Sequence, residues 1–261
     1  PALARFRGAH VCVVGVGGVG SWIVEALARS AIGQLTLIDL DNVAESNINR
    51  QLQALTSTVG QAKIFALAER IAQINPYCVV HQVEDFVTPD NLDQMLGANK
   101  FDYVVDAIDS VKAKAAMIAH CRRHDMPLVI IGSAGGQTDP TQIAVRDLGR
   151  TEQEPLLKKV RRLLRSQYGF AKGEKTKFHV DAVFSMEPLK YPDAVAEGAE
   201  GEACAVDASG ITGLNCAGFG SAMVVTATFG MVAAGHVLRQ LAQPASHAAP
   251  PLVAPEATVQ N

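Results

Sequence analysis

The sequence predicts an α/β fold with a doubly wound, mostly parallel sheet, followed by a C-terminal part of mixed α and β structure. Three observations support this prediction. Short apolar runs alternate with longer runs of helical periodicity as far as Gly132. A glycine-rich turn follows the first apolar run, and the alternation loosens after Gly132. Strands that alternate with helices form a parallel sheet covered on both faces.

The expected elements follow the chain in this order. A buried strand is expected at residues 10–15, and further strands are expected at 34–39, 78–85, 103–109 and 127–132. Helical periodicity predicts helices at 21–31, 61–76, 91–96 and 111–125. The second part should contain a half-exposed strand at 141–148, an amphipathic helix at 155–168 and a loop at 193–207. The tail from residue 244 is mostly Ala, Pro and Val and is expected to be disordered.

The composition is that of an ordinary globular protein. Of the 261 residues, 48% are hydrophobic and 19% charged, and the net charge is −3. The five cysteines include no C-x-x-C pair, which argues against a zinc ribbon or a dithiol redox site. An odd cysteine count without a signal peptide suits a reducing compartment, so we expect a cytoplasmic protein.

The stretch 208–238 contains no Asp, Glu, Lys or Arg and is long enough to span a membrane. More than half of its residues are Gly, Ala, Ser or Thr, and no aromatic belt flanks it. This favours a buried helix that packs tightly or lies at a dimer interface. Membrane association remains the alternative.

Gly15, Gly17, Gly18 and Gly20 lie between the first strand and the first helix. Glycines at this place let the backbone turn tightly and approach a phosphate, whose charge is favoured at a helix N-terminus. Asp39 follows the second strand, where an acid can bind the ribose hydroxyls of a nucleotide. The pattern predicts a Rossmann-like nucleotide site. A tight turn without a ligand is the alternative.

Further polar residues follow Asp39. Asn47, Arg50 and Lys63 are expected on the loop and helix that return to the same edge of the sheet. Two cations suit a triphosphate whose departing pyrophosphate must be stabilised. Asp109, expected at the end of the fourth strand, could hold Mg²⁺ between the phosphates. Taken singly, the cations could be solvated surface residues, and Asp109 could simply cap a helix.

The motifs GVGGVGS, LIDLDNVAESNINRQ, VGQAK and DAIDS resemble those of the ubiquitin-activating-enzyme-like adenylating superfamily. The resemblance covers about residues 6–145. It implies that a substrate carboxylate attacks the α-phosphate of ATP, which gives an acyl-adenylate and pyrophosphate. It also implies catalytic roles for Arg50, Lys63 and Asp109, with Asp109 as the Mg²⁺ ligand. The implied ATP-binding set is Gly17, Gly18, Asp39, Asp41, Ser46, Asn47, Arg50, Lys63, Asp109 and Ser110.

Four more motifs, at 84–91, 135–143, 181–192 and 218–230, resemble the bacterial tRNA threonylcarbamoyladenosine dehydratases over nearly the whole chain. This family implies ATP-dependent activation and cyclisation of N6-threonylcarbamoyladenosine in tRNA with net loss of water. A homodimer and a sulfur-transfer protein partner are implied with it. Two features depart from the pattern: the paired C-x-x-C motifs of zinc-binding relatives are absent, so no zinc is expected, and the family's N-terminal arm is not evident.

The stretch 158–177 holds eight basic residues and one acid. Contacts with phosphates would give tRNA affinity and salt dependence, and a solvated helix face is the alternative. Cys216 resembles a cysteine that is considered as a thioester nucleophile in the superfamily. Ring closure needs no enzyme thioester, however, and a small buried thiol is an equally good interpretation of Cys216. The basic residues expected to contact tRNA are Lys158, Lys159, Arg161, Arg162 and Arg165.

The expected organisation is a nucleotide-binding adenylation half at 1–150, a half at 151–243 that binds tRNA and forms the interface, and the tail at 244–261. Two other functions remain open. An activator of a small ubiquitin-like sulfur-carrier protein would share the adenylation site, but the basic stretch and the missing zinc motifs favour the dehydratase. An NAD-dependent oxidoreductase would use the glycines and Asp39, but would leave Arg50, Lys63 and Asp109 unexplained.

Overall fold

The computed structural model describes residues 1–97, 101–173, 176–188 and 220–243. Its centre is a seven-stranded sheet in the order β3-β2-β1-β4-β5-β7-β6. All neighbouring strands are parallel except β6, which runs antiparallel to β7. The strands are β1 His10–Val14, β2 Gln34–Ile38, β3 Val79–Val83, β4 Tyr103–Asp106, β5 Leu128–Ile131, β6 Ile143–Asp147 and β7 Asp181–Ser185.

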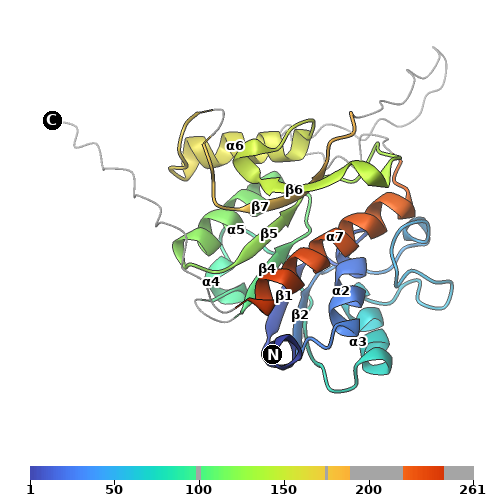
Figure 1. The fold of residues 1–261 in the computed structure, drawn as a ribbon. Helices are drawn as coiled ribbons and strands as arrows, with labels where there is room; N and C mark the ends of the chain where they lie inside the picture. The colour runs from blue at the N-terminus through green and yellow to red at the C-terminus, as the bar shows by residue number, and fades with distance from the viewer. Residues whose placement is uncertain (98–100, 174–175, 189–219, 244–261) are drawn as a thin grey trace, which may run out of the picture.

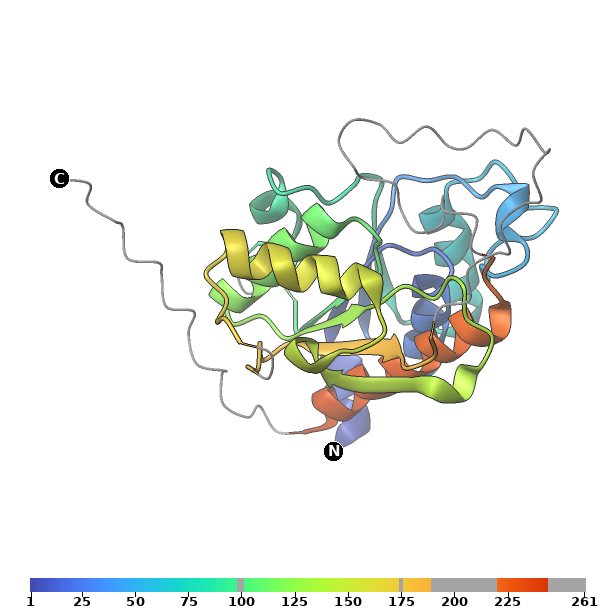
Figure 2. The same ribbon diagram turned by 90° about the horizontal axis from the view of Figure 1, so that it is seen from above.

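Helices cover both faces of the sheet, as the alternating pattern predicts (Figures 1 and 2). Apolar residues of α2, α3 and α7 pack on one face, and those of α4, α5 and α6 pack on the other. The helices are α1 Ala2–Gly8, α2 Gly20–Arg29, α3 Lys63–Ile74, α4 Leu92–Met95, α5 Val111–Arg123, α6 Pro155–Gln167 and α7 Met223–Ala242. Short 3-10 helices in the described part of the chain are η1 Glu45–Asn47, η2 Pro140–Gln142 and η3 Leu148–Arg150. The predicted fold class is confirmed.

One α-helix and one strand were not among the expected elements. Helix α1 precedes the first strand and lies beside the end of α7, where the Arg5 side chain bonds the carbonyl of Ala242. Strand β7 inserts between β5 and β6, so strands from both sides of residue 150 share one sheet. The pairing of β7 with β5 and β6 joins segments that are distant in the sequence, and local periodicity cannot predict such a pairing.

Two expected strands differ from the observed ones. The strand at 103–109 ends at Asp106, because the Asp106 carboxylate accepts a hydrogen bond from the Ile108 amide (3.2 Å) and the chain turns there. Asp109 therefore lies on a turn and not at a strand end. The strand at 78–85 is an edge strand with mostly outward-facing residues, and Val79 is half exposed. Its apolar run reflects β propensity and not burial on two faces.

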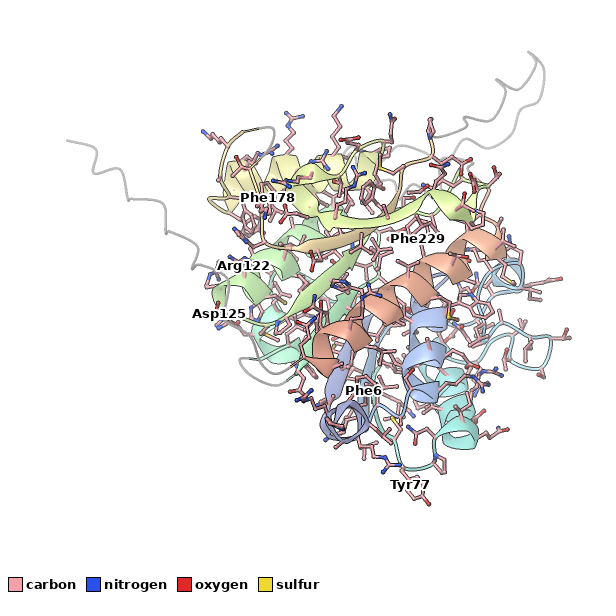
Figure 3. The ribbon with its side chains drawn as sticks, in the orientation of Figure 1. Phe6, Tyr77, Arg122, Asp125, Phe178 and Phe229 are labelled. Carbon is pink, nitrogen blue, oxygen red and sulfur yellow. The ribbon has the colours of Figure 1, made fainter. Side chains whose placement is uncertain are left out.

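The uncharged stretch 208–238 is described only from Gly220, and there it forms most of α7. One face of α7 is buried through Val225, Phe229, Ala233 and Val237, and Figure 3 shows Phe229 where α7 crosses the sheet. The opposite face exposes Met223, Val224 and Met231. Within the described ranges, no helix combines the length and apolarity needed to cross a bilayer. The predicted loop at 193–207 and tail at 244–261 lie outside the described residues.

Candidate functional site

A cavity of about 570 Å³ opens at the carboxyl ends of β1, β2, β4 and β5. This is the edge at which ligands bind in open parallel sheets. Nine of the ten residues expected to bind ATP line the cavity: Gly17, Gly18, Asp39, Asp41, Asn47, Arg50, Lys63, Asp109 and Ser110. Ser46 is the exception, since it lies on η1 and its backbone carbonyl accepts a hydrogen bond from Arg50 Nη1 (2.8 Å). The structure thus brings together residues that are far apart in the sequence.

The glycines of the first turn serve different purposes. Gly15 has a φ of +83°, which a side chain would strain. A Cβ at Gly20 would lie 1.9 Å from the carbonyl oxygen of Gly15, so the start of α2 requires glycine for packing. At Gly17 and Gly18 an added Cβ would meet only side-chain atoms, at 3.5 Å or more. The loop therefore leaves room beside Gly17 and Gly18, at the positive end of α2, where an anion is favoured.

Asp39 connects the glycine loop to the end of β2. Its Oδ2 accepts a hydrogen bond from the Val16 amide (2.8 Å), and its Oδ1 accepts one from the Asp41 amide (2.9 Å). The side chain is largely buried but borders the cavity. A carboxylate fixed in this way can accept hydrogen bonds from ribose hydroxyls without reorganising, because the backbone already orients it.

Two cations line one side of the cavity. Lys63 Nζ lies 2.7 Å from Asp41 Oδ2, at the start of α3. Arg50 follows η1, and its Nη1 also donates to Asn49 Oδ1 (3.0 Å). The backbone carbonyl of Arg50 accepts a hydrogen bond from Trp22 Nε1 (3.0 Å), so α2 fixes the position of the residue. The arrangement places two positive charges beside the glycine loop, as a bound triphosphate requires.

Asp109 and Ser110 also line the cavity, at the end of the turn between β4 and α5. Asp109 is exposed and borders the cavity, while Ser110 is the N-cap of α5 and accepts a hydrogen bond from the Ala113 amide (3.5 Å). An exposed carboxylate at the cavity offers the oxygen ligands that Mg²⁺ prefers. Asp109 therefore has the chemistry to hold a magnesium ion that accompanies a bound nucleotide.

Several other residues line the cavity that the sequence reasoning did not single out. Gln51 follows Arg50 within the same motif, and Ser133 and Gly135 follow the end of β5. The rule that ligands bind at strand ends could have found the segment after β5. Ser221 lies just before α7 and Thr226 in its first turn; both belong to the motif at 218–230, but local periodicity could not place them at the cavity.

The five basic residues expected to contact tRNA lie on α6, and among the residues of that helix only Leu156 lines the cavity. Lys158, Lys159 and Arg162 are exposed. Arg161 bonds Thr151 Oγ1, and burial lowers the pKa of its guanidinium. Arg165 donates to the carbonyl of Gly173 (2.9 Å), and its guanidinium carbon lies 5.1 Å from the centre of the Phe178 ring, labelled in Figure 3.

Cys216 lies outside the described residues. The structure describes three cysteines, Cys12, Cys78 and Cys121, and the side chains of Cys12 and Cys121 are buried. Burial raises the pKa of Cys78 to about 11 and that of Cys121 to about 12, so neither forms a thiolate readily near neutral pH.

Comparison with known proteins shows the family of the chain. The model of the ThiF family matches residues 1–259. The chain belongs to the ThiF family. Among ThiF-family proteins, the tRNA threonylcarbamoyladenosine dehydratase of Haemophilus influenzae is 51% identical over 92% of this chain and 88% of its own length. The Escherichia coli protein of the same name is 54% identical over 92% of this chain and 88% of its own length.

The crystal structure of the E. coli dehydratase in complex with ATP has a TM-score of 0.80 to this structure, with 52% identity, and covers 92% of this chain and 88% of the E. coli chain. A second E. coli structure, with AMP, matches with the same TM-score, identity and coverage. The resemblance to adenylating enzymes and to bacterial dehydratases is therefore confirmed. The roles expected for individual residues are not tested by these comparisons.

Proposed function

We propose that this protein uses ATP to dehydrate N6-threonylcarbamoyladenosine in tRNA, closing a ring through an acyl-adenylate. The observation that carries the proposal is the meeting of Asp39, Arg50, Lys63 and Asp109 around one cavity. An acid for ribose, two cations for phosphates and a carboxylate for Mg²⁺ are the groups an adenylation site needs. Relatives that are more than 50% identical over 92% of the chain bear the name of this activity.

In the first step, ATP binds with its ribose at Asp39 and its phosphates at Gly17, Gly18 and Asn47, between Arg50 and Lys63. A carboxylate oxygen of the threonyl group attacks the α-phosphorus, and the bond to the β-phosphate oxygen breaks. Arg50 and Lys63 stabilise the charge that develops on the pyrophosphate. Magnesium held by Asp109 would supply further neutralisation of the phosphates.

In the second step, a nucleophilic atom of the same threonylcarbamoyl side chain attacks the activated carbonyl carbon. The bond between that carbon and the AMP oxygen breaks, and the nucleophile loses its proton. AMP leaves with one oxygen of the former carboxylate, so the nucleoside loses the elements of one water molecule. Effective molarity favours this ring closure over attack by an outside nucleophile. The step requires no thiol, so we propose that Cys216 is not the nucleophile.

The tRNA is proposed to contact α6. Lys158, Lys159 and Arg162 are exposed on this helix, and Leu156 of the same helix lines the cavity. The helix could therefore contact the RNA backbone while one end of it borders the cavity.

The exposed apolar residues Met223, Val224 and Met231 support a homodimer that uses α7. We further propose a sulfur-transfer protein partner, a cytoplasmic location and a protein without zinc. We also propose a division at residue 150, with an adenylation half before it and a half after it that binds tRNA and forms the interface.

Mass spectrometry of nucleosides tests the proposal. Purified protein is incubated with ATP, Mg²⁺ and tRNA that carries N6-threonylcarbamoyladenosine, and unmodified tRNA serves as the control. The modified nucleoside should lose the mass of one water only when ATP is present. If the nucleoside stays unchanged while ATP is consumed in the presence of a small ubiquitin-like sulfur-carrier protein, the activator function replaces the dehydratase.

A further inference from the structure

Two buried, oppositely charged residues lie close to the cavity without lining it. Asp106 is the last residue of β4, and Lys114 lies in the first turn of α5. Both side chains are 0% exposed, and Lys114 Nζ lies 2.7 Å from Asp106 Oδ1. The same ammonium donates to the backbone carbonyl of Asp106 (3.2 Å). Neither residue has a part in the reaction described above.

The ion pair closes the turn that carries Asp109. Lys114 reaches back across eight positions to the end of β4, and the residues between them include four that line the cavity. Within this turn, Asp106 Oδ1 also accepts from the Ile108 amide, and Ser110 Oγ accepts from the Ala113 amide. Lys114 therefore joins the strand before the turn to the helix after it.

The charge of Lys114 also acts on a second buried carboxylate, that of Glu154. Glu154 is 4% exposed, and its Oε1 accepts a hydrogen bond from the amide of Ser133, which lines the cavity. Burial raises the pKa of the Glu154 carboxyl, and the ammonium of Lys114 opposes this rise. Burial likewise raises the pKa of Asp106, which Lys114 also opposes. One buried cation thus acts on two buried carboxylates, those of Asp106 and Glu154.

Burial of charged groups is costly, and replacing a buried ion pair by apolar groups is often neutral or stabilising. Stability alone therefore gives a weak reason for the pair. A role in orienting a metal ligand gives a stronger reason, because removal of a group that supports such a ligand displaces the ligand. We propose that Lys114 is a positioning residue for adenylation: through Asp106 it fixes the turn at 107–110, so that the Asp109 carboxylate meets the magnesium of bound ATP. This inference rests on the proposed function.

The test compares three full-length variants with the wild type. Lys114→Met removes the ammonium but leaves the buried Asp106 uncompensated, which can prevent folding. The double variant Asp106→Asn with Lys114→Met removes both charges and keeps similar shapes, so it carries the test if the single variant does not fold. Lys112→Met, an exposed lysine of the same helix, is the matched control. Thermal unfolding reports the integrity of each fold.

Calorimetry measures ATP affinity first with EDTA and then across a Mg²⁺ titration, and pyrophosphate release gives the Mg²⁺ dependence of turnover. We expect the double variant to bind metal-free ATP like the wild type. Its half-saturating Mg²⁺ concentration should rise about 10–100-fold, as is typical when a group that supports a metal ligand is removed. The KM for tRNA should stay unchanged while kcat falls, and Lys112→Met should follow the wild type.

The proposal is overturned if a folded double variant has the Mg²⁺ dependence of the wild type. It is also overturned if metal-free ATP affinity falls as much as the Mg²⁺ response, because that result indicates general damage to the site. If wild-type protein binds Mg²⁺–ATP but releases no pyrophosphate, the proposed function fails. The calorimetric comparison then still decides the role of Lys114.

Discussion

Lys63 Nζ lies 2.7 Å from Asp41 Oδ2, with the lysine side chain 6% exposed and the aspartate side chain 55% exposed. The more exposed Asp41 carboxylate therefore pairs with the buried Lys63 ammonium at the cavity. A triphosphate that enters beside Gly17 and Gly18 can share this ammonium, because a lysine has three donors. The lysine is oriented by Asp41 before ATP binds, which reduces the reorganisation needed during the reaction.

Lys63→Ala should leave the fold intact, since Asp41 is exposed enough to be solvated when its partner is gone. Turnover should fall about 10²–10³-fold, the usual cost of removing one preorganised electrostatic interaction from a transition state. Lys63→Arg keeps the charge and should retain more activity than the alanine variant. Pyrophosphate release under saturating substrates is the measurement. Wild-type turnover in Lys63→Ala would remove this residue from the catalytic set.

Trp22→Phe should impair the site without touching the substrate. The indole of Trp22 donates to the carbonyl of Arg50, and phenylalanine preserves most of the packing while removing that donor. The missing hydrogen bond is worth roughly 0.5–1.5 kcal/mol. We expect a several-fold lower kcat, and a melting temperature lowered by a few degrees. The idea that α2 fixes Arg50 fails if the kinetics of Trp22→Phe match those of the wild type.

Neutralising Lys158, Lys159 and Arg162 together should weaken tRNA binding and leave ATP binding unchanged. These three residues are exposed, whereas Arg161 and Arg165 are tied to other parts of the chain. The slope of log affinity against log salt should flatten by roughly 0.7–0.9 for each phosphate that the variant no longer neutralises. Arg7, Arg123 and Arg239, exposed on other helices, provide a control with the same charge change. Equal slopes in both triple variants would make α6 an ordinary solvated surface.

Asp181→Asn should change the acid stability of the fold. The imidazole of His236, whose Nε2 lies 3.1 Å from Asp181 Oδ2, lowers the pKa of Asp181 below its ordinary value of 3.8. A carboxyl whose folded pKa is lowered contributes stability above its unfolded pKa, and this contribution disappears as the pH falls through the folded value. The variant should therefore lose less stability than the wild type below about pH 4. Denaturant unfolding at pH 3, 4 and 7 measures this difference.

The sequence predicted the parallel core because buried strands and amphipathic helices have local periods that alternate clearly as far as Gly132. It predicted most of the cavity for a second reason: parallel strands end at one edge, so polar residues after β1, β2 and β4 must meet there. Strand β7 and the contribution of Ser221 and Thr226 depend on segments that meet only in the folded chain. Lys114 was missed because a lysine in the first turn of a helix is usually a surface residue.

The central claim is that the carboxylate is activated as an adenylate. The most direct measurement uses tRNA whose threonylcarbamoyl carboxylate carries ¹⁸O, with the phosphate products separated by chromatography and weighed by mass spectrometry. Attack on the α-phosphorus must transfer one labelled oxygen to AMP and release unlabelled pyrophosphate, and this is the predicted result. ADP together with labelled inorganic phosphate would mean that the carboxylate attacks the γ-phosphate, and would contradict the account.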